Sequence, residues 1–305
     1  MRLAIVALLA MAVFGTAAPM TSAFAQDNAA QETAHRQAML ARLPADAAKR
    51  VFGLETTPAP GPARPIGDYT KGCVAGAVQL PADGPTWQVM RPSRNRAWGL
   101  PLLIGFLEQV AASLPAAGWP GLLVGDMGQP RGGPMLTGHA SHQIGLDVDI
   151  WFTPMPARRL SPSERDNISA TDLVNGDGSA VDPRAWGPQY GRLLEVFARR
   201  PEVERIFVNP AIKRALCREA GADRAWLERI RPWWGHNYHF HVRLACPQGD
   251  AECRDQRPPP PGDGCGADLD WWFTRDTKNL VPHAPAIGPR LSEMPGACPA
   301  IARMP

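Results

Sequence analysis

The sequence predicts an α+β fold, in which a small antiparallel sheet has flanking helices and long loops tied by disulfides. Helical and strand-like patterns are intermixed along the chain, which suggests a compact domain of this class. The segment GLDVDIWF at 145–152 alternates strictly, as a half-buried strand does. From residue 247 onward the chain is rich in proline and glycine, so we expect irregular loops that cysteines hold in place.

The first 25 residues predict a secretory signal peptide. Arg2 precedes an apolar run over residues 3–18, and AFA at 23–25 is a small-x-small cleavage pattern before Gln26. A transmembrane anchor is the alternative, but the run is shorter than the ~20 residues that a membrane span needs. No other long apolar segment follows, so we expect a soluble mature protein.

We expect residues 26–65 to form an N-terminal lead-in with a proline-rich arm, and residues 66–305 to form the main domain. Residues 26–50 have a helical composition but weak patterning, so we expect loose packing there. The stretch TTPAPGPARPIG at 56–67 is proline-rich, which is typical of an extended linker or surface arm. The mature chain of about 280 residues is long enough for one substantial core.

The elements of the main domain follow from the spacing of apolar residues. We expect helices at 99–115, 189–199, 210–220 and 223–230, and strands at 121–127, 145–152, 205–209 and 238–244. Asn209 and Pro210 predict where the third of these helices begins, because asparagine caps helix N-termini and proline fits the first turn.

Charge and cysteine content narrow the class of protein. A formal net charge of +3 without a basic run gives no reason to expect nucleic acid as a partner. The chain has 6 cysteines and is predicted to be exported, so three disulfides are expected. Spacing alone does not choose among their 15 possible pairings. There is no CxxC pair, which argues against a redox motif or a zinc ribbon.

Five of the 7 histidines fall into two clusters. The segment GHASHQIGLDVDIW contains His139 and His142, and the segment HNYHFH contains His236, His239 and His241. The other two histidines, His35 and His283, are expected to be ordinary hydrogen-bonded side chains on the surface or in the core.

The two clusters can meet at one point. His239 and His241 are two residues apart on a strand and share a face, and Asp149 lies on the polar face of its own strand. If the two strands are neighbours, Asp149 and the histidine pair converge, and His142 can fold over them. Two imidazoles and a carboxylate, with one open position, are typical of a catalytic zinc site. Asp147 shares the face of Asp149, where it faces the site or hydrogen-bonds a ligand histidine.

His-x6-Asp followed by His-x-His resembles the LAS metallopeptidases. Within that group the chain is most similar to the penicillin-insensitive murein endopeptidase family, from about Ile66 to Cys298. The resemblance is carried by the cysteine placement and by YTKGCVAGAVQLP, RPSRNRAWGLP, RGGPMLTGHASHQIGLDVDIWF, RIFVNPAIKRALC and RPWWGHNYHFHVRLACP.

The resemblance implies a role for each residue of the two clusters. His142, Asp149 and His241 match the family's zinc ligands. His139 falls in the family's active-site histidine set, and we place it with these three in the expected metal group. His239 matches the catalytic base. We expect His236 to stabilise the oxyanion or to orient the substrate.

The resemblance also implies three disulfides, Cys73–Cys298, Cys217–Cys265 and Cys246–Cys253. A second metal in the polar stretch NGDGSAVD is not expected, because Asp177 and Asp182 stand there without a histidine.

The implied function is a periplasmic, Zn²⁺-dependent endopeptidase that cuts D-alanyl-diaminopimelate cross-links in peptidoglycan. No GxSxG or SxxK pattern indicates a serine enzyme, in keeping with insensitivity to penicillin. A zinc D,D- or L,D-carboxypeptidase on the same scaffold is one alternative, and a non-catalytic wall-binding protein is another. The oligomeric state, the role of the proline-rich arm and the preference for D,D or L,D cross-links stay open.

Overall fold

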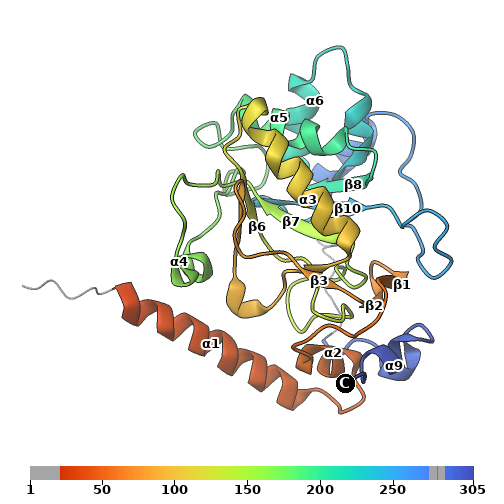
Figure 1. Cartoon of the computed structure of the whole chain (residues 1–305). Coiled ribbons are helices and arrows are strands. Elements are labelled where there is room, and N and C mark those ends of the chain that lie inside the picture. Colours follow the sequence, from red (N-terminus) through yellow and green to blue (C-terminus); the bar gives the residue numbers. More distant parts are fainter. Residues whose placement is uncertain (1–20, 275–279, 281–285) are drawn as a thin grey trace, which may run out of the picture.

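The computed structural model describes residues 21–274, 280 and 286–305 (Figure 1). Its main sheet has six strands in the order β4-β6-β7-β10-β8-β9. Their bounds are β4 Trp87–Val89, β6 Leu122–Val124, β7 Asp147–Trp151, β10 His239–Leu244, β8 Val203–Val208 and β9 Ile230–Pro232. The central strands β6, β7, β10 and β8 pair antiparallel, whereas the edge pairs β4–β6 and β8–β9 are parallel. The predicted α+β class is confirmed, and the parallel edge pairs are an addition to it.

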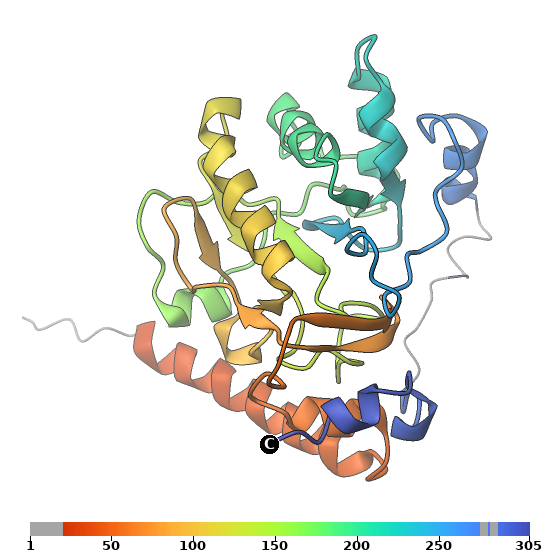
Figure 2. The ribbon, with the colours of Figure 1, turned by 45° about the vertical axis from the view of Figure 1, so that its right-hand side comes forward.

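Helices α3 (Pro101–Ser113), α5 (Pro188–Ala198) and α6 (Pro210–Glu219) gather on one side of this sheet (Figures 1 and 2). Their apolar side chains and those of β7, β10 and β8 form one core cluster. The Asn209 side chain accepts a hydrogen bond from the Ala211 amide and caps α6, as predicted. The fourth predicted helix is a short 3-10 helix over Ala225–Arg229.

A second, smaller core lies beside the first. It is built from α2 (Ala48–Leu54), the antiparallel hairpin of β1 (Arg64–Asp68) and β2 (Lys71–Ala75), and α9 (Cys298–Ile301) (Figure 2). The segment 56–67, expected to be a linker or surface arm, therefore ends in a paired strand. Ile66 on this strand is buried in the same core cluster as Phe52, and this burial stabilises the strand. The remaining elements are α1 Thr21–Arg42, β3 Val78–Gln79, β5 Trp98–Gly99, α4 Pro162–Asn167 and α7 Ala267–Asp270.

The predicted signal peptide falls mostly outside the described residues, which begin at Thr21, the first residue of α1. Cleavage before Gln26 stays a prediction. Within the described part of the chain, no helix is both long enough and apolar enough to cross a membrane. His35 is exposed on α1, as expected, and His283 lies outside the described residues.

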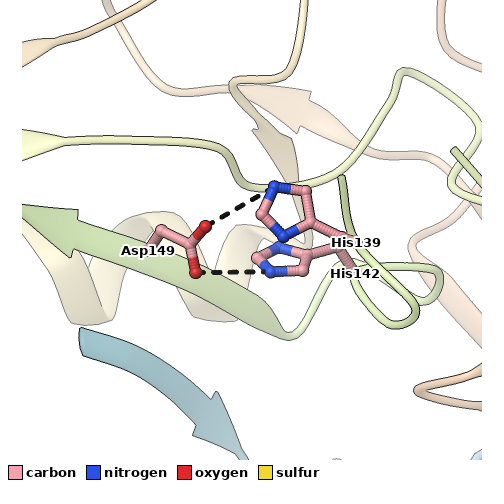
Figure 3. Close-up of side chains that lie close together, drawn as sticks. All are labelled: His139, His142 and Asp149. Carbon is pink, nitrogen blue, oxygen red and sulfur yellow. Dashed lines mark ion pairs between the residues drawn. The ribbon is translucent and has the colours of Figure 1, made fainter. Parts of the chain in front are cut away.

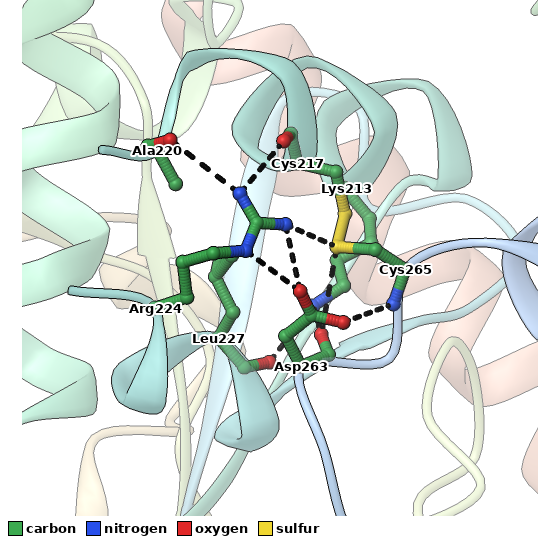
Figure 4. The surroundings of a disulfide bond; sticks show 7 residues. All are labelled: Lys213, Cys217, Ala220, Arg224, Leu227, Asp263 and Cys265. Carbon is green, nitrogen blue, oxygen red and sulfur yellow. Dashed lines mark hydrogen bonds and ion pairs between the residues drawn. A yellow bond between two sulfur atoms is a disulfide. The ribbon is translucent and has the colours of Figure 1, made fainter. Parts of the chain in front are cut away.

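All three expected disulfides are confirmed: Cys73–Cys298, Cys217–Cys265 and Cys246–Cys253. The second ties α6 to the irregular C-terminal region (Figure 4). Around it, Arg224 donates to the Asp263 carboxylate, and the buried Lys213 donates to the carbonyls of Leu227 and Asp263. Burial lowers the pKa of Lys213 to about 7. These contacts fix the region that follows β10.

Replacing both Cys217 and Cys265 with alanine is expected to lower the free energy of unfolding by ~2–4 kcal/mol, because the loop between them loses its constraint in the unfolded state. That pair closes 48 residues, whereas Cys246–Cys253 closes only 7. The matched Cys246→Ala/Cys253→Ala variant should therefore lose less stability in urea unfolding. A larger loss from the short loop would contradict this account.

Candidate metal centre

Strands β7 and β10 lie side by side and present the predicted residues on one face. Their register pairs His241 with Asp149 and His239 with Trp151. Phe240, which alternates with the two histidines, is fully buried in the main core with Val148 and Ile150. The sequence-based expectation that these strands are neighbours is confirmed. Asp149, His239 and His241 therefore share the face opposite the helices.

The two predicted histidine clusters meet above this face. The loop before β7 brings His139 and His142 over Asp149 (Figure 3). Adjacent ring centroids are 4.3 Å apart for His139 and His142, 4.5 Å for His142 and His241, and 4.9 Å for His236 and His239. His142 and His236 both have a positive φ, 66° and 54°, which is uncommon outside glycine and concentrates at functional sites.

Three ligand-type atoms form a nearly equilateral triangle. His142 Nε2 lies 3.2 Å from His241 Nδ1 and 3.4 Å from Asp149 Oδ1, and the last two atoms are 3.4 Å apart. Tetrahedral ligands at the usual zinc distances are themselves about 3.3 Å apart. Asp149 Oδ1 is buried and has no hydrogen-bond partner among the described residues. Such an oxygen fits a cation between the three atoms.

The partners of the two rings determine which nitrogen of each ring is free to bind a cation. His142 Nδ1 lies 2.8 Å from the carbonyl oxygen of Met127, which only accepts, so this nitrogen carries the proton. His241 Nε2 donates to Asp147 Oδ1 at 3.0 Å in the same way. When both rings are neutral, the lone pairs of His142 Nε2 and His241 Nδ1 face Asp149. The Asp149 carboxylate outweighs burial and raises the pKa of His142. A hydrogen-bonded carboxylate or carbonyl behind each ring is the common support of a metal-binding histidine.

Asp147 supports the ring of His241 and the backbone of His142, whereas the sequence suggested a hydrogen bond to one ligand histidine. Its Oδ2 accepts from the backbone amide of His142 at 2.9 Å, and Arg243 donates to both of its oxygens. Burial by itself raises the pKa of the Asp147 carboxyl, but Arg243 and His241 outweigh it and hold the pKa below its usual range. Burial likewise opposes ionisation of Asp149, and the surrounding histidines hold its pKa well below the usual value. Both carboxylates are ionised at neutral pH.

His139 has a partner that sequence reasoning missed, Asp126. His139 Nε2 lies 2.9 Å from Asp126 Oδ2 and 3.6 Å from Asp149 Oδ2. Arg94 and Arg96 donate to the same Asp126 oxygen. His139, His142 and Asp149 also form a group that could hold a metal, with atoms within 4.8 Å of one another. The triangle that includes His241 is tighter. Asp126 lies inside the strand predicted at 121–127 and two residues after the observed end of β6, and no motif in the sequence singled it out.

His239 and His236 complete the histidine cluster and lie against each other. Burial lowers the pKa of both rings, that of His236 to about 3. His236 Nδ1 donates to the carbonyl of Trp234 at 2.7 Å, so its Nε2 carries a lone pair. His239 Nε2 lies 3.6 Å from Asp149 Oδ2, and its buried Nδ1 has no hydrogen-bond partner in the described structure. Burial thus favours the neutral form of both rings.

A cavity of about 320 Å³ opens at this face. His139, Asp149 and His239 line its floor, and its other lining residues include Arg91, Arg94, Trp151, Asp172 and Tyr238. The residues considered for a second metal are engaged elsewhere: Asp182 pairs with Arg184, and Asp177 accepts from the Ser179 amide.

Histidines and a carboxylate that converge beside a cavity, on the polar face of an α+β sheet, define the site of a metal-dependent hydrolase. A family model described as penicillin-insensitive murein endopeptidase matches residues 65–303. The chain belongs to this peptidase family.

Curated relatives carry the same description. The protein of that name from Klebsiella pneumoniae subsp. pneumoniae is 46% identical over 246 residues, covering 81% of this chain and 88% of the relative. The one from Yersinia enterocolitica is 45% identical over 249 residues, with 81% and 88% covered. The one from Haemophilus influenzae is 47% identical over 231 residues, with 75% and 80% covered.

Proposed function

We propose that this protein is a periplasmic zinc endopeptidase that hydrolyses the D-alanyl-diaminopimelate cross-links of murein. Family membership and the function for which the relatives are named support the reaction. The observation that carries the metal assignment is the triangle of His142 Nε2, His241 Nδ1 and Asp149 Oδ1. Two nitrogens and one oxygen at this spacing suit zinc with one position left for water or substrate. Zinc bound by these residues would supply a Lewis acid for the scissile carbonyl and would lower the pKa of the attacking water.

The side chains around the metal site have separate roles in orienting the ligands, transferring the proton and positioning the substrate. Asp147 and the Met127 carbonyl orient the two ligand histidines. His239 lines the cavity as a neutral ring and accepts the proton of the attacking water, then delivers it to the leaving amine. Since the Nε2 of neutral His236 accepts rather than donates, we assign His236 to orienting water or substrate rather than to the oxyanion. His139, held by Asp126, supports Asp149 from the side of the cavity.

Purified protein lacking residues 1–25 is the sample for the test. It is incubated with a defined cross-linked muropeptide dimer in the presence of penicillin, with and without chelator, and products are identified by mass. We expect conversion of the dimer to two monomers, blocked by the chelator and restored by zinc. Trimming of terminal residues would instead indicate a carboxypeptidase. Binding of the dimer by zinc-loaded protein without cleavage would indicate a wall-binding protein.

A further inference from the structure

An arginine-rich turn forms one wall of the cavity. Residues 91–96 contain three arginines, and Arg91 and Arg94 line the same cavity as Asp149 and His239. Arg91 and Asn95, which flank the turn Pro92–Arg94, are both in the left-handed region, at φ 56° and 52°. Backbone strain of this kind outside glycine is held by surrounding structure and concentrates where ligands bind.

Arg91 differs from its two neighbours in its partners. Arg94 and Arg96 both pair with the Asp126 carboxylate. Arg91 donates instead to the main-chain carbonyls of Asp166 and Ile168, and it forms no ion pair with any described residue. Carbonyl oxygens orient a guanidinium but do not neutralise its charge. These two bonds use two of its five N–H donors, so others are left for a ligand.

The guanidinium is anchored close to the reacting groups. Its Cζ lies 5.3 Å from the ring centroid of Trp151, a cation–π contact that fixes its height above the sheet. Trp151 is the residue of β7 directly opposite His239 on β10. Such pairs have Cβ atoms about 5 Å apart. Burial, followed by the neighbouring Arg94, lowers the pKa of Arg91, and the carboxylates of Asp166 and Asp126 only partly oppose this shift.

We propose that Arg91 binds a free carboxylate of the cross-link peptide beside the scissile bond. The inference rests on the proposed murein substrate. The diaminopimelate that supplies the scissile nitrogen retains a carboxylate on the same carbon, and the diaminopimelate of the other stem retains one as well. A planar guanidinium recognises a carboxylate through paired N–H donors, which a carboxamide cannot match in charge. Arg91 thereby distinguishes carboxylate-bearing cross-links from amidated ones.

The test compares three muropeptide dimers in wild type and Arg91→Gln. One dimer has free carboxylates, one is amidated at the amine-donating diaminopimelate, and one at the diaminopimelate of the other stem. We expect one amidation to lower kcat/KM of the wild type on the order of 10- to 100-fold, mainly through KM. Arg91→Gln should cleave the dimer with free carboxylates and the dimer that the wild type cleaves poorly about equally. The amidation that lowers kcat/KM of the wild type identifies the carboxylate that Arg91 binds.

Controls separate recognition from folding. Arg91→Lys should keep part of the preference, because it keeps the charge. Arg159→Gln removes an exposed arginine paired with Asp83 and should leave the preference unchanged. If Arg91→Gln slows all three dimers by the same factor and keeps the wild-type preference, Arg91 is only structural and the proposal is wrong.

A binding measurement keeps this inference separate from the proposed reaction. Dissociation constants of the three dimers are measured in the His239→Ala background, with and without Arg91→Gln. If the affinities for the free and amidated dimers differ, and Arg91→Gln removes that difference, the carboxylate site is supported. This holds even if the wild type cleaves none of the dimers, because lack of cleavage would refute only the proposed reaction. Equal affinity for all three dimers before Arg91 is changed would overturn the carboxylate site.

Discussion

His239→Ala is expected to bind zinc stoichiometrically and to lose ~10²- to 10⁴-fold in kcat, the usual contribution of a positioned general base. The ring lines the cavity, and its nearest contact to the carboxylate, 3.6 Å from Nε2 to Asp149 Oδ2, is too long for a hydrogen bond. It is not part of the ligand triangle, so its removal should leave the metal in place. Single-turnover cleavage of the muropeptide dimer and elemental analysis of the same sample check the two halves of this prediction.

His35→Ala is the control, because this histidine is exposed on α1. It should match the wild type in both measurements. Near-normal turnover in His239→Ala would remove His239 as the proton acceptor. Loss of zinc in His239→Ala would instead move it into the ligand set.

His142→Ala is expected to lose stoichiometric zinc and, with it, all measurable hydrolysis. Its Nε2 is one corner of the triangle, and the two remaining ligands cannot hold the ion at micromolar zinc. The buried Asp149 would also lose a neighbour that compensates its charge. Because zinc stabilises only the state that binds it, added zinc should raise the melting temperature of the wild type but not of His142→Ala.

His139→Ala is the matched comparison, since this histidine lies in the same loop and contacts the same carboxylate. If Asp126, rather than the metal, is its partner, zinc affinity should fall by only ~10- to 100-fold, as for other residues that support a ligand. Equal loss of zinc in both variants would favour the alternative group of His139, His142 and Asp149.

Much of the site is local in sequence, which is why it was predictable. A strand places residues two apart on one face, so His239 and His241 share a face whatever surrounds them. The same rule places Asp149 opposite Val148 and Ile150. The helices at α3, α5 and α6 follow from apolar spacing and agree with the predicted ranges to within two residues. The disulfide pairings came from the family resemblance, because cysteine spacing alone allows every pairing.

Contacts between segments that are far apart in the sequence could not be predicted from local sequence patterns. The pairing of β6 with β7 brings Asp126 to His139, and the turn at Arg91 reaches the cavity only because it packs over Trp151. The hairpin β1–β2 was not predicted, because β1 begins in the proline-rich stretch and the burial of both strands depends on α2 and α9.

The sequence by itself therefore determined the fold class, the main helices and strands, and the residue types gathered at the site, because these depend on periodicity and neighbouring residues. Only the tertiary structure decided which nitrogen of each histidine faces Asp149, which acid holds His139, and which arginine of the turn at 91–96 forms no ion pair with a described residue. The physical reason is that protonation, orientation and charge balance depend on partners that the chain brings together from far apart in sequence.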